Sequence, residues 1–125
     1  MAAYRILTVD DDEAIRLLVR ENLELCEFEV VEAASGREAL QVIAAAPPDL
    51  IILDVRMPPP DGWDVLRILR GHPETEALPV VMLTVLADDT NVARGWDIGA
   101  DFYLSKPFEP GELLSVVKRL LTQPL

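Results

Sequence analysis

Short apolar runs alternate with longer amphipathic segments along the whole chain. The apolar runs predict β-strands at residues 5–9, 29–32, 50–53, 80–83 and 102–104. The amphipathic segments predict helices at residues 13–25, from Ser35-Gly36 to before Pro47-Pro48, at 62–70, from Asp88 or Asp89 to near Gly99, and at 111–121. Residues 50–53 are apolar at every position, which is typical of a parallel strand that is covered on both faces.

This order of elements predicts an α/β protein with five βα units. Strands that alternate with helices in this way form a parallel sheet with right-handed crossovers and helices on both faces. We therefore expect a (βα)5 doubly wound, five-stranded parallel sheet of the flavodoxin-like kind. The chain has 125 residues, which is the length of one domain, so residues 1–125 are expected to form a single domain.

Charge and composition narrow the classes of partner. Eleven basic and 22 acidic residues give a net charge of -11, which argues against direct contact with nucleic acid or with an anionic membrane. The N-terminus has no signal-peptide pattern, so a cytoplasmic location is expected.

The lone Cys26 excludes an internal disulfide and is expected to be a small core residue. The single His72 lies in a turn sequence and is expected at the surface.

Polar, reactive side chains follow four of the five predicted strands. They are Asp10, Asp11 and Asp12 after the first strand, Asp54 after the third, Thr84 after the fourth and Lys106 after the fifth. In open α/β sheets the ligand site lies outside the carboxyl ends of the strands. Asp12 is explained as a helix cap, and a single strand-end aspartate or threonine carries little information. The combination of these side chains at the ends of four strands predicts a functional site there.

The residue types at these strand ends suit phosphoryl chemistry. Carboxylates that lie close together repel one another unless a proton or a cation is shared, and oxygen ligands favour Mg²⁺ or Mn²⁺. A lysine can pair with a carboxylate or a phosphoryl oxygen, and a threonine hydroxyl can donate to one. Such a site suits transfer of a phosphoryl group to an aspartate.

With these motifs the chain resembles the receiver domain of bacterial two-component response regulators, which have the chemotaxis-regulator-like fold. The resemblance covers residues 5–121. Its motifs are residues 9–12 after strand one, residues 53–62 after strand three, Thr84, residues 99–101 before strand five and residues 106–108 after it.

The resemblance implies a role for each matching residue. Asp54 would be the phosphoacceptor. The metal ligands would be Asp54, Asp11, Asp10 (largely through metal-bound water) and the backbone carbonyl of Arg56. Thr84 and Lys106 would contact the phosphoryl group, Thr84 and Tyr103 would form the switch, and the Lys106–Pro107 bond would be cis.

The implied function is a phosphorylation-dependent signalling switch. A histidine kinase or histidine phosphotransfer protein would phosphorylate the chain, with Mg²⁺ or Mn²⁺ as cofactor. The surface of the fourth helix, fifth strand and fifth helix would then change and regulate a downstream protein. The chain would catalyse its own modification without being a turnover enzyme. Phe102 and Val116 replace charged residues of the family's dimerising members, so a monomer or weak homodimer is expected.

Some positions depart from the family pattern. Val85 stands where a small residue is usual, and Glu27 stands in a turn that usually has glycine. A positive φ at Glu27 would cost on the order of 1 kcal/mol. Trp96 is expected to pack in the core, whereas Trp63 could serve packing or partner contact.

Other functions remain open on the sequence alone. Val85 leaves room for a degenerate receiver that acts as a protein-binding scaffold, and the chain could be a receiver domain excised from a longer response regulator or hybrid kinase. A haloacid-dehalogenase-like phosphatase would need an aspartate at position 56, where the chain has Arg56. A flavodoxin-like nucleotide binder would need a phosphate loop after strand one, where the acidic residues would repel phosphate.

Overall fold

A computed structural model describes residues 3–85 and 99–122 of the chain. The elements are β1 (Arg5–Val9), α1 (Glu13–Leu25), β2 (Glu29–Ala33), α2 (Gly36–Ala45), β3 (Leu50–Asp54), α3 (Gly62–Arg70), β4 (Val80–Thr84), β5 (Phe102–Ser105) and α5 (Pro110–Thr122). The predicted helix from Asp88 or Asp89 to near Gly99 and the predicted packing of Trp96 lie outside the described residues, apart from Gly99 itself.

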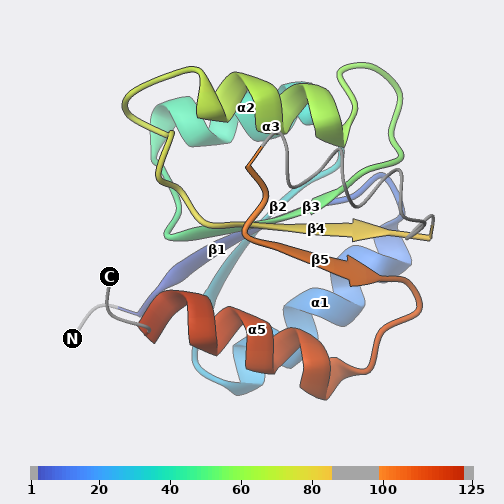
Figure 1. The fold of residues 1–125 in the computed structure, drawn as a ribbon. Coiled ribbons are helices and arrows are strands. Elements are labelled where there is room, and N and C mark those ends of the chain that lie inside the picture. Colours follow the sequence, from blue (N-terminus) through green and yellow to red (C-terminus); the bar gives the residue numbers. More distant parts are fainter. Residues whose placement is uncertain (1–2, 86–98, 123–125) are drawn as a thin grey trace.

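All five strands are parallel, in the order β2-β1-β3-β4-β5 (Figure 1). The chain goes from β1 outward to β2 and then returns to β3 on the other side of β1, so the direction of winding reverses between β1 and β3. A ligand site in a doubly wound sheet lies at such a switch point, beyond the carboxyl ends of the strands. Asp10 follows β1 and Asp54 ends β3, so two predicted site residues lie there.

Helices cover both faces of the sheet, α2 and α3 on one and α1 and α5 on the other (Figure 1). Because side chains alternate along a strand, each strand supplies both layers. On β1, Leu7 and Val9 face the α2–α3 layer, whereas Ile6 faces the α1–α5 layer. All three are fully buried. The predicted fold class is therefore confirmed.

The strands extend slightly further than the apolar runs predict. Val55 N–H donates to the Leu83 carbonyl at 2.9 Å, and Lys106 N–H donates to the Thr84 carbonyl at 2.7 Å. The hydrogen-bond ladder thus continues through Asp54 and Thr84, which are the last residues of β3 and β4. These two polar side chains are therefore carried by strands instead of loops, which fixes their positions more closely.

Local signals set the helix ends. Asp12 caps α1 by accepting from Ala14 N–H, and Asp61 forms a capping box with Asp64 at the start of α3. Glu27 has φ 65°, so this residue takes the positive φ considered for it from the sequence. Cys26 caps the C-terminus of α1 and is only partly buried. Its predicted place in the core was wrong, because Cys26 lies just beyond the last helical residue and outside both buried clusters.

The segment that enters β5 is fixed by Arg70, at the end of α3. Arg70 donates through Nε to the Gly99 carbonyl at 2.8 Å and forms an ion pair through Nη2 with Asp101 at 3.0 Å. The Asp101 carboxylate also accepts from Val80 N–H at 2.8 Å. The Gly99-Ala100-Asp101 motif therefore joins the starts of β4 and β5 to α3. Among the described residues, no helix has the length and apolar character needed to span a membrane.

Candidate functional site

Three carboxylates converge at the switch point between β1 and β3. Asp10, Asp11 and Asp54 each offer a carboxylate oxygen, and these oxygens lie within 4.8 Å of one another. Asp10 is 1% exposed and Asp54 is 3% exposed, whereas Asp11 is open to solvent. Two buried carboxylates and one exposed carboxylate therefore make a small acidic cluster that solvent can reach from one side.

Lys106 brings a positive charge into this cluster. Its Nζ lies 2.7 Å from Asp10 Oδ2 and 3.2 Å from Asp54 Oδ1. The Lys106 side chain is 13% exposed, and the Lys106–Pro107 peptide bond is cis, as predicted. The ammonium group of Lys106 therefore lies between the two buried carboxylates and contacts both, although Lys106 is distant from them in the sequence.

The environment of Asp54 favours its neutral form. Burial raises the pKa of Asp54 from 3.8 to about 6, and the nearby charge of Asp10 adds to this rise. The charge and hydrogen bond of Lys106 act in the opposite direction but do not cancel it. At neutral pH the Asp54 carboxylate is still mostly ionised, and because it is poorly solvated it gains from any added cation.

The pKa of Lys106 is shifted as well. Burial by itself would lower the pKa of this ammonium group. The hydrogen bonds and negative charges of Asp10 and Asp54 outweigh burial, so the pKa is raised above its usual value. Lys106 therefore stays charged at neutral pH.

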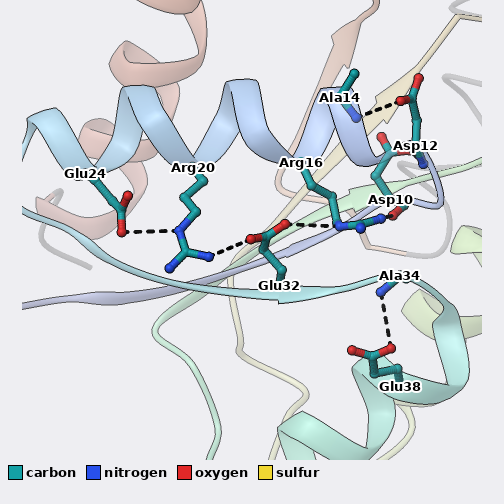
Figure 2. Close-up of polar contacts among 9 residues, drawn as sticks. All are labelled: Asp10, Asp12, Ala14, Arg16, Arg20, Glu24, Glu32, Ala34 and Glu38. Atoms are coloured by element: carbon teal, nitrogen blue, oxygen red, sulfur yellow. Dashed lines mark hydrogen bonds and ion pairs between the residues drawn. The ribbon is translucent and has the colours of Figure 1, made fainter.

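Asp10 is held through both its backbone and its side chain. Its N–H donates to the Ala33 carbonyl on β2 at 3.2 Å. Its Oδ1 accepts from Asp12 N–H at 2.9 Å, while Oδ2 faces Lys106. Its carbonyl oxygen accepts from Arg16 Nη1 at 2.7 Å (Figure 2). The turn from β1 into α1 is therefore fixed at its first residue.

The loop after Asp54 passes very close to the strand end. Arg56 is exposed, and its N–H lies 3.4 Å from Asp54 Oδ1. Gly62 N–H donates to the Val55 carbonyl at 3.1 Å. A Cβ atom at Gly62 would lie 2.3 Å from the Asp54 carbonyl oxygen. Only glycine therefore allows α3 to begin so close to β3.

The two predicted switch residues lie on neighbouring strands. Thr84 is fully buried at the end of β4, where its register partner on β5 is Ser105. Tyr103 is half-buried on β5 and stacks on Trp63. Val85 follows Thr84 and is 57% exposed. Trp63 is 3% exposed, so among the two predicted roles the structure favours packing.

The structure thus brings together Asp10, Asp11, Asp54 and Lys106, four of the residues predicted from the strand ends. Thr84, also predicted there, ends β4, the strand next to β3. Sequence reasoning missed Arg16, which contacts Asp10 and Glu32. The available signal was the four-residue spacing of Arg16, Arg20 and Glu24 on one helix. That spacing predicts ion pairs along the helix, but it does not predict a contact with β2 or with a backbone carbonyl.

The acidic cluster fits a hard divalent cation. Its donors are carboxylate oxygens, which are the ligands that Mg²⁺ and Mn²⁺ prefer. Asp11 is open to solvent, so water can complete an octahedral shell there. A cation would also relieve the repulsion between buried Asp10 and Asp54, which Lys106 only partly offsets.

Comparisons with known proteins agree with this geometry. The DNA-binding dual master transcriptional regulator RpaA of Synechocystis sp. is 43% identical over 117 residues, which are 94% of this chain and 48% of RpaA. The chain spans about half the length of the curated relatives it matches.

Solved structures match over nearly the whole chain. The chemotaxis protein CheY4 of Vibrio cholerae is 37% identical with a TM-score of 0.91, covering 96% of this chain and 100% of that one. The signal receiver domain of a signal transduction histidine kinase from Syntrophus aciditrophicus is 36% identical with a TM-score of 0.90, covering 98% and 96%. The family model of the response regulator receiver domain matches residues 6–118. The chain therefore belongs to the response regulator receiver domain family.

Proposed function

We propose that the chain is a phosphorylation-dependent signalling switch and that Asp54 accepts the phosphoryl group. One observation carries the proposal: a buried carboxylate ends β3 at the switch point of the sheet, in contact with Lys106 and beside two further carboxylates. Membership of the receiver family supports a histidine kinase as the source of the phosphoryl group. A histidine phosphotransfer protein carries the same phosphohistidine and is an equivalent donor.

The reaction is a transfer from nitrogen to oxygen. A carboxylate oxygen of Asp54 attacks phosphorus and forms a P–O bond while the P–N bond of phosphohistidine breaks. The electron pair of that bond stays on the imidazole, which takes up a proton from solvent. The pKa of Asp54, about 6, leaves the nucleophile mostly ionised at neutral pH. The ammonium group of Lys106 lies where it can move from Asp54 to a phosphoryl oxygen.

The cation site would be formed by Asp10, Asp11, Asp54 and the backbone carbonyl of Arg56. Bound Mg²⁺ or Mn²⁺ would supply positive charge that offsets the charge on the phosphoryl oxygens. Both oxygens of Asp10 already accept hydrogen bonds, one from Asp12 N–H and one from Lys106. This supports direct ligation by Asp11 and contact through water for Asp10.

The phosphoryl group would reach the surface through Thr84 and Tyr103. A phosphoryl oxygen offers the Thr84 hydroxyl a charge-assisted hydrogen bond, worth roughly 1.5–3 kcal/mol. Such a bond can shift a two-state equilibrium about ten- to hundredfold. Movement of Thr84 would let Tyr103 change position on β5. The surface that includes β5 and α5, with the predicted helix before β5, would then bind a downstream protein differently.

Membership of the family says less about partners other than the phosphoryl donor. RpaA is a DNA-binding regulator of about twice this length, so attachment to a DNA-binding domain is one setting for such a receiver. The net charge of -11 makes contact between this domain itself and nucleic acid unfavourable. We still predict a monomer or weak homodimer, because Phe102 and Val116 are uncharged at positions where the family's dimerising members have charged residues.

Phosphorylation by acetyl phosphate in Mg²⁺ tests the proposal. Intact-mass spectrometry should show one phosphoryl adduct, which is absent in Asp54→Asn. Asp12→Asn is the matched control because Asp12 is exposed and adjacent to the cluster, and asparagine also caps helices well. The control should be labelled like the parent. An unlabelled parent would favour the protein-binding scaffold instead, and labelled Asp54→Asn would refute Asp54 as the acceptor.

A further inference from the structure

Arg16 connects the acidic cluster to the far edge of the sheet. It lies in the second turn of α1, and its side chain is 15% exposed. Nη1 donates to the Asp10 carbonyl oxygen at 2.7 Å, and Nε donates to Glu32 Oε1 on β2 at 3.1 Å. One guanidinium group therefore contacts both the site loop and β2.

The orientation of Arg16 is itself supported by a chain of ion pairs. Glu32 Oε2 accepts from Arg20 Nη1 at 2.6 Å, and Arg20 Nε lies 3.3 Å from Glu24 Oε2 (Figure 2). Glu32 therefore lies between two arginines of α1, one on each carboxylate oxygen. This arrangement leaves the remaining edge of the Arg16 guanidinium directed at the Asp10 carbonyl.

The Asp10 carbonyl belongs to the peptide unit that joins Asp10 to Asp11. Because a peptide unit is planar, fixing its carbonyl oxygen also fixes the direction in which Asp11 leaves the strand. The N–H of Asp10 is fixed separately by the Ala33 carbonyl. Arg16 thus completes the anchoring of the residue that precedes the exposed carboxylate of the cluster, and its positive charge reduces the repulsion there.

We propose that Arg16 is a positioning residue for the cation site, because its hydrogen bond to the Asp10 carbonyl holds Asp11 in place for the cation. This inference rests on the proposed cation site, and it adds a residue that contacts neither the cation nor the phosphoryl group. Loss of a group that orients a metal ligand by hydrogen bonding, without contacting the metal, commonly weakens metal binding about 10- to 100-fold.

The competing explanation is that Arg16 only attaches α1 to β2. Arg20 separates the two explanations because it pairs with the same Glu32 carboxylate, from the next turn of the same helix, and does not contact Asp10. Replacing either arginine by glutamine removes one charge and one ion pair to Glu32. Only Arg16→Gln also removes the donor to the Asp10 carbonyl.

Calorimetric titration with Mg²⁺ and amide exchange in metal-free protein test the proposal. We expect Arg16→Gln to weaken Mg²⁺ binding about tenfold and Arg20→Gln to change it less than twofold. Hydrogen exchange at the Asp11 and Asp12 amides, measured with EDTA present, should be faster in Arg16→Gln than in Arg20→Gln. If glutamine at position 16 prevents folding, Arg16→Lys and Arg20→Lys repeat the comparison with the charge retained. In Arg16→Lys one ammonium nitrogen replaces the two guanidinium nitrogens that bond Glu32 and the Asp10 carbonyl separately.

Equal weakening of Mg²⁺ binding in the two variants, or unchanged binding in a folded Arg16 variant, would overturn the positioning role. The phosphorylation assay of the parent protein gives a separate answer about Asp54. A parent protein that binds Mg²⁺ but takes no phosphoryl group would refute the proposed function and leave the role of Arg16 intact. A parent that is labelled normally, with Arg16→Gln binding Mg²⁺ like Arg20→Gln, would refute only the role of Arg16.

Discussion

The ring of Tyr103 stacks on the indole of Trp63, with ring centroids 6.1 Å apart and ring planes inclined by 27°. Trp63 is the second residue of α3, which begins directly after the loop that follows Asp54. Tyr103 lies on β5, two strands away from Asp54. The stack therefore joins the proposed switch residue to the helix that starts beside the proposed phosphoacceptor, and aromatic pairs of this kind are worth about 0.5–1.5 kcal/mol beyond burial.

This contact predicts an optical signal for the switch. In a Trp96→Phe background, the remaining indole emission comes from Trp63. We expect Mg²⁺ with beryllofluoride, a phosphoryl mimic, to change the intensity or wavelength of that emission, because a move of Tyr103 alters the surroundings of the indole. Steady-state fluorescence measures this change.

Thr84→Ala supplies the control for the optical signal. It should still bind beryllofluoride but should lose most of the fluorescence change, because the hydroxyl that couples the site to Tyr103 is gone. An equally large change in Thr84→Ala would show that Thr84 does not transmit the signal. No change in a parent protein that demonstrably binds beryllofluoride would show that the stack is unaffected.

The sequence predicted the sheet well because its signals are local and repeated. Residues 50–53 are apolar at every position, as a strand covered on both faces requires. The cluster of Asp10, Asp54 and Lys106 followed from a rule of topology, since parallel strands end at one edge of the sheet. No detail of side-chain packing was needed for either prediction.

What the sequence could not predict depends on which side chains meet across the fold. The contact of Arg16 with the Asp10 carbonyl needs the packing angle of α1 on the sheet, which no local pattern encodes. The stack of Trp63 on Tyr103 joins residues 40 positions apart in the sequence. The predicted end of the first helix at Leu25 is correct, yet Cys26, the residue just after it, is only partly buried. Helical periodicity does not predict the burial of a residue beyond the helix, because that depends on how the following turn packs.

Asp54 should make the stability of the metal-free protein depend on pH. Burial raises the pKa of Asp54 to about 6 in the folded protein, from 3.8. The folded state therefore holds the proton more tightly than the unfolded chain does. This contribution is complete below about pH 4 and is lost as the pH rises through about 6, so the free energy of unfolding falls over that range.

Asp54→Asn should remove this loss of stability. The full shift corresponds to about 3 kcal/mol, and screening by solvent on the open side reduces the expected gain at pH 7.5 to about 1–2 kcal/mol. Urea unfolding in EDTA at pH 7.5 and pH 4 measures the gain, which should be close to zero at pH 4. A variant that is no more stable than the parent at pH 7.5 would contradict the unfavourable burial of ionised Asp54.

Gly62→Ala should disturb the end of β3. The added Cβ would lie 2.3 Å from the Asp54 carbonyl oxygen and 2.7 Å from Val55 Cα, so backbone must move. We expect a loss of about 1–3 kcal/mol in the free energy of unfolding and slower labelling by acetyl phosphate. Denaturant unfolding and intact-mass spectrometry measure the two effects.

Gly111→Ala is the matched control for that substitution. Gly111 lies in α5, and a Cβ atom there would have open space around it. Because alanine is the better helix former, the control should gain roughly 0.5 kcal/mol and should be labelled like the parent. Equal stability of Gly62→Ala and the parent would mean that the start of α3 can move away from β3 at no cost.

Val85 is expected to control how long the phosphoryl group remains on Asp54. It follows Thr84 at the carboxyl end of β4, and its side chain is 57% exposed. A β-branched side chain has few rotamers, so in this place it would obstruct the approach of water to the phosphoryl group. Val85→Ala should therefore shorten the half-life of the phosphorylated protein about two- to fivefold, which corresponds to about 0.4–1 kcal/mol of activation free energy. Decay of the phosphoryl adduct, followed by mass spectrometry after removal of acetyl phosphate, measures the half-life.

Leu25→Ala is the control, because Leu25 is 82% exposed at the other end of α1 from the cluster and should leave the half-life unchanged. An unchanged or longer half-life in Val85→Ala would show that this side chain does not shield the phosphoryl group.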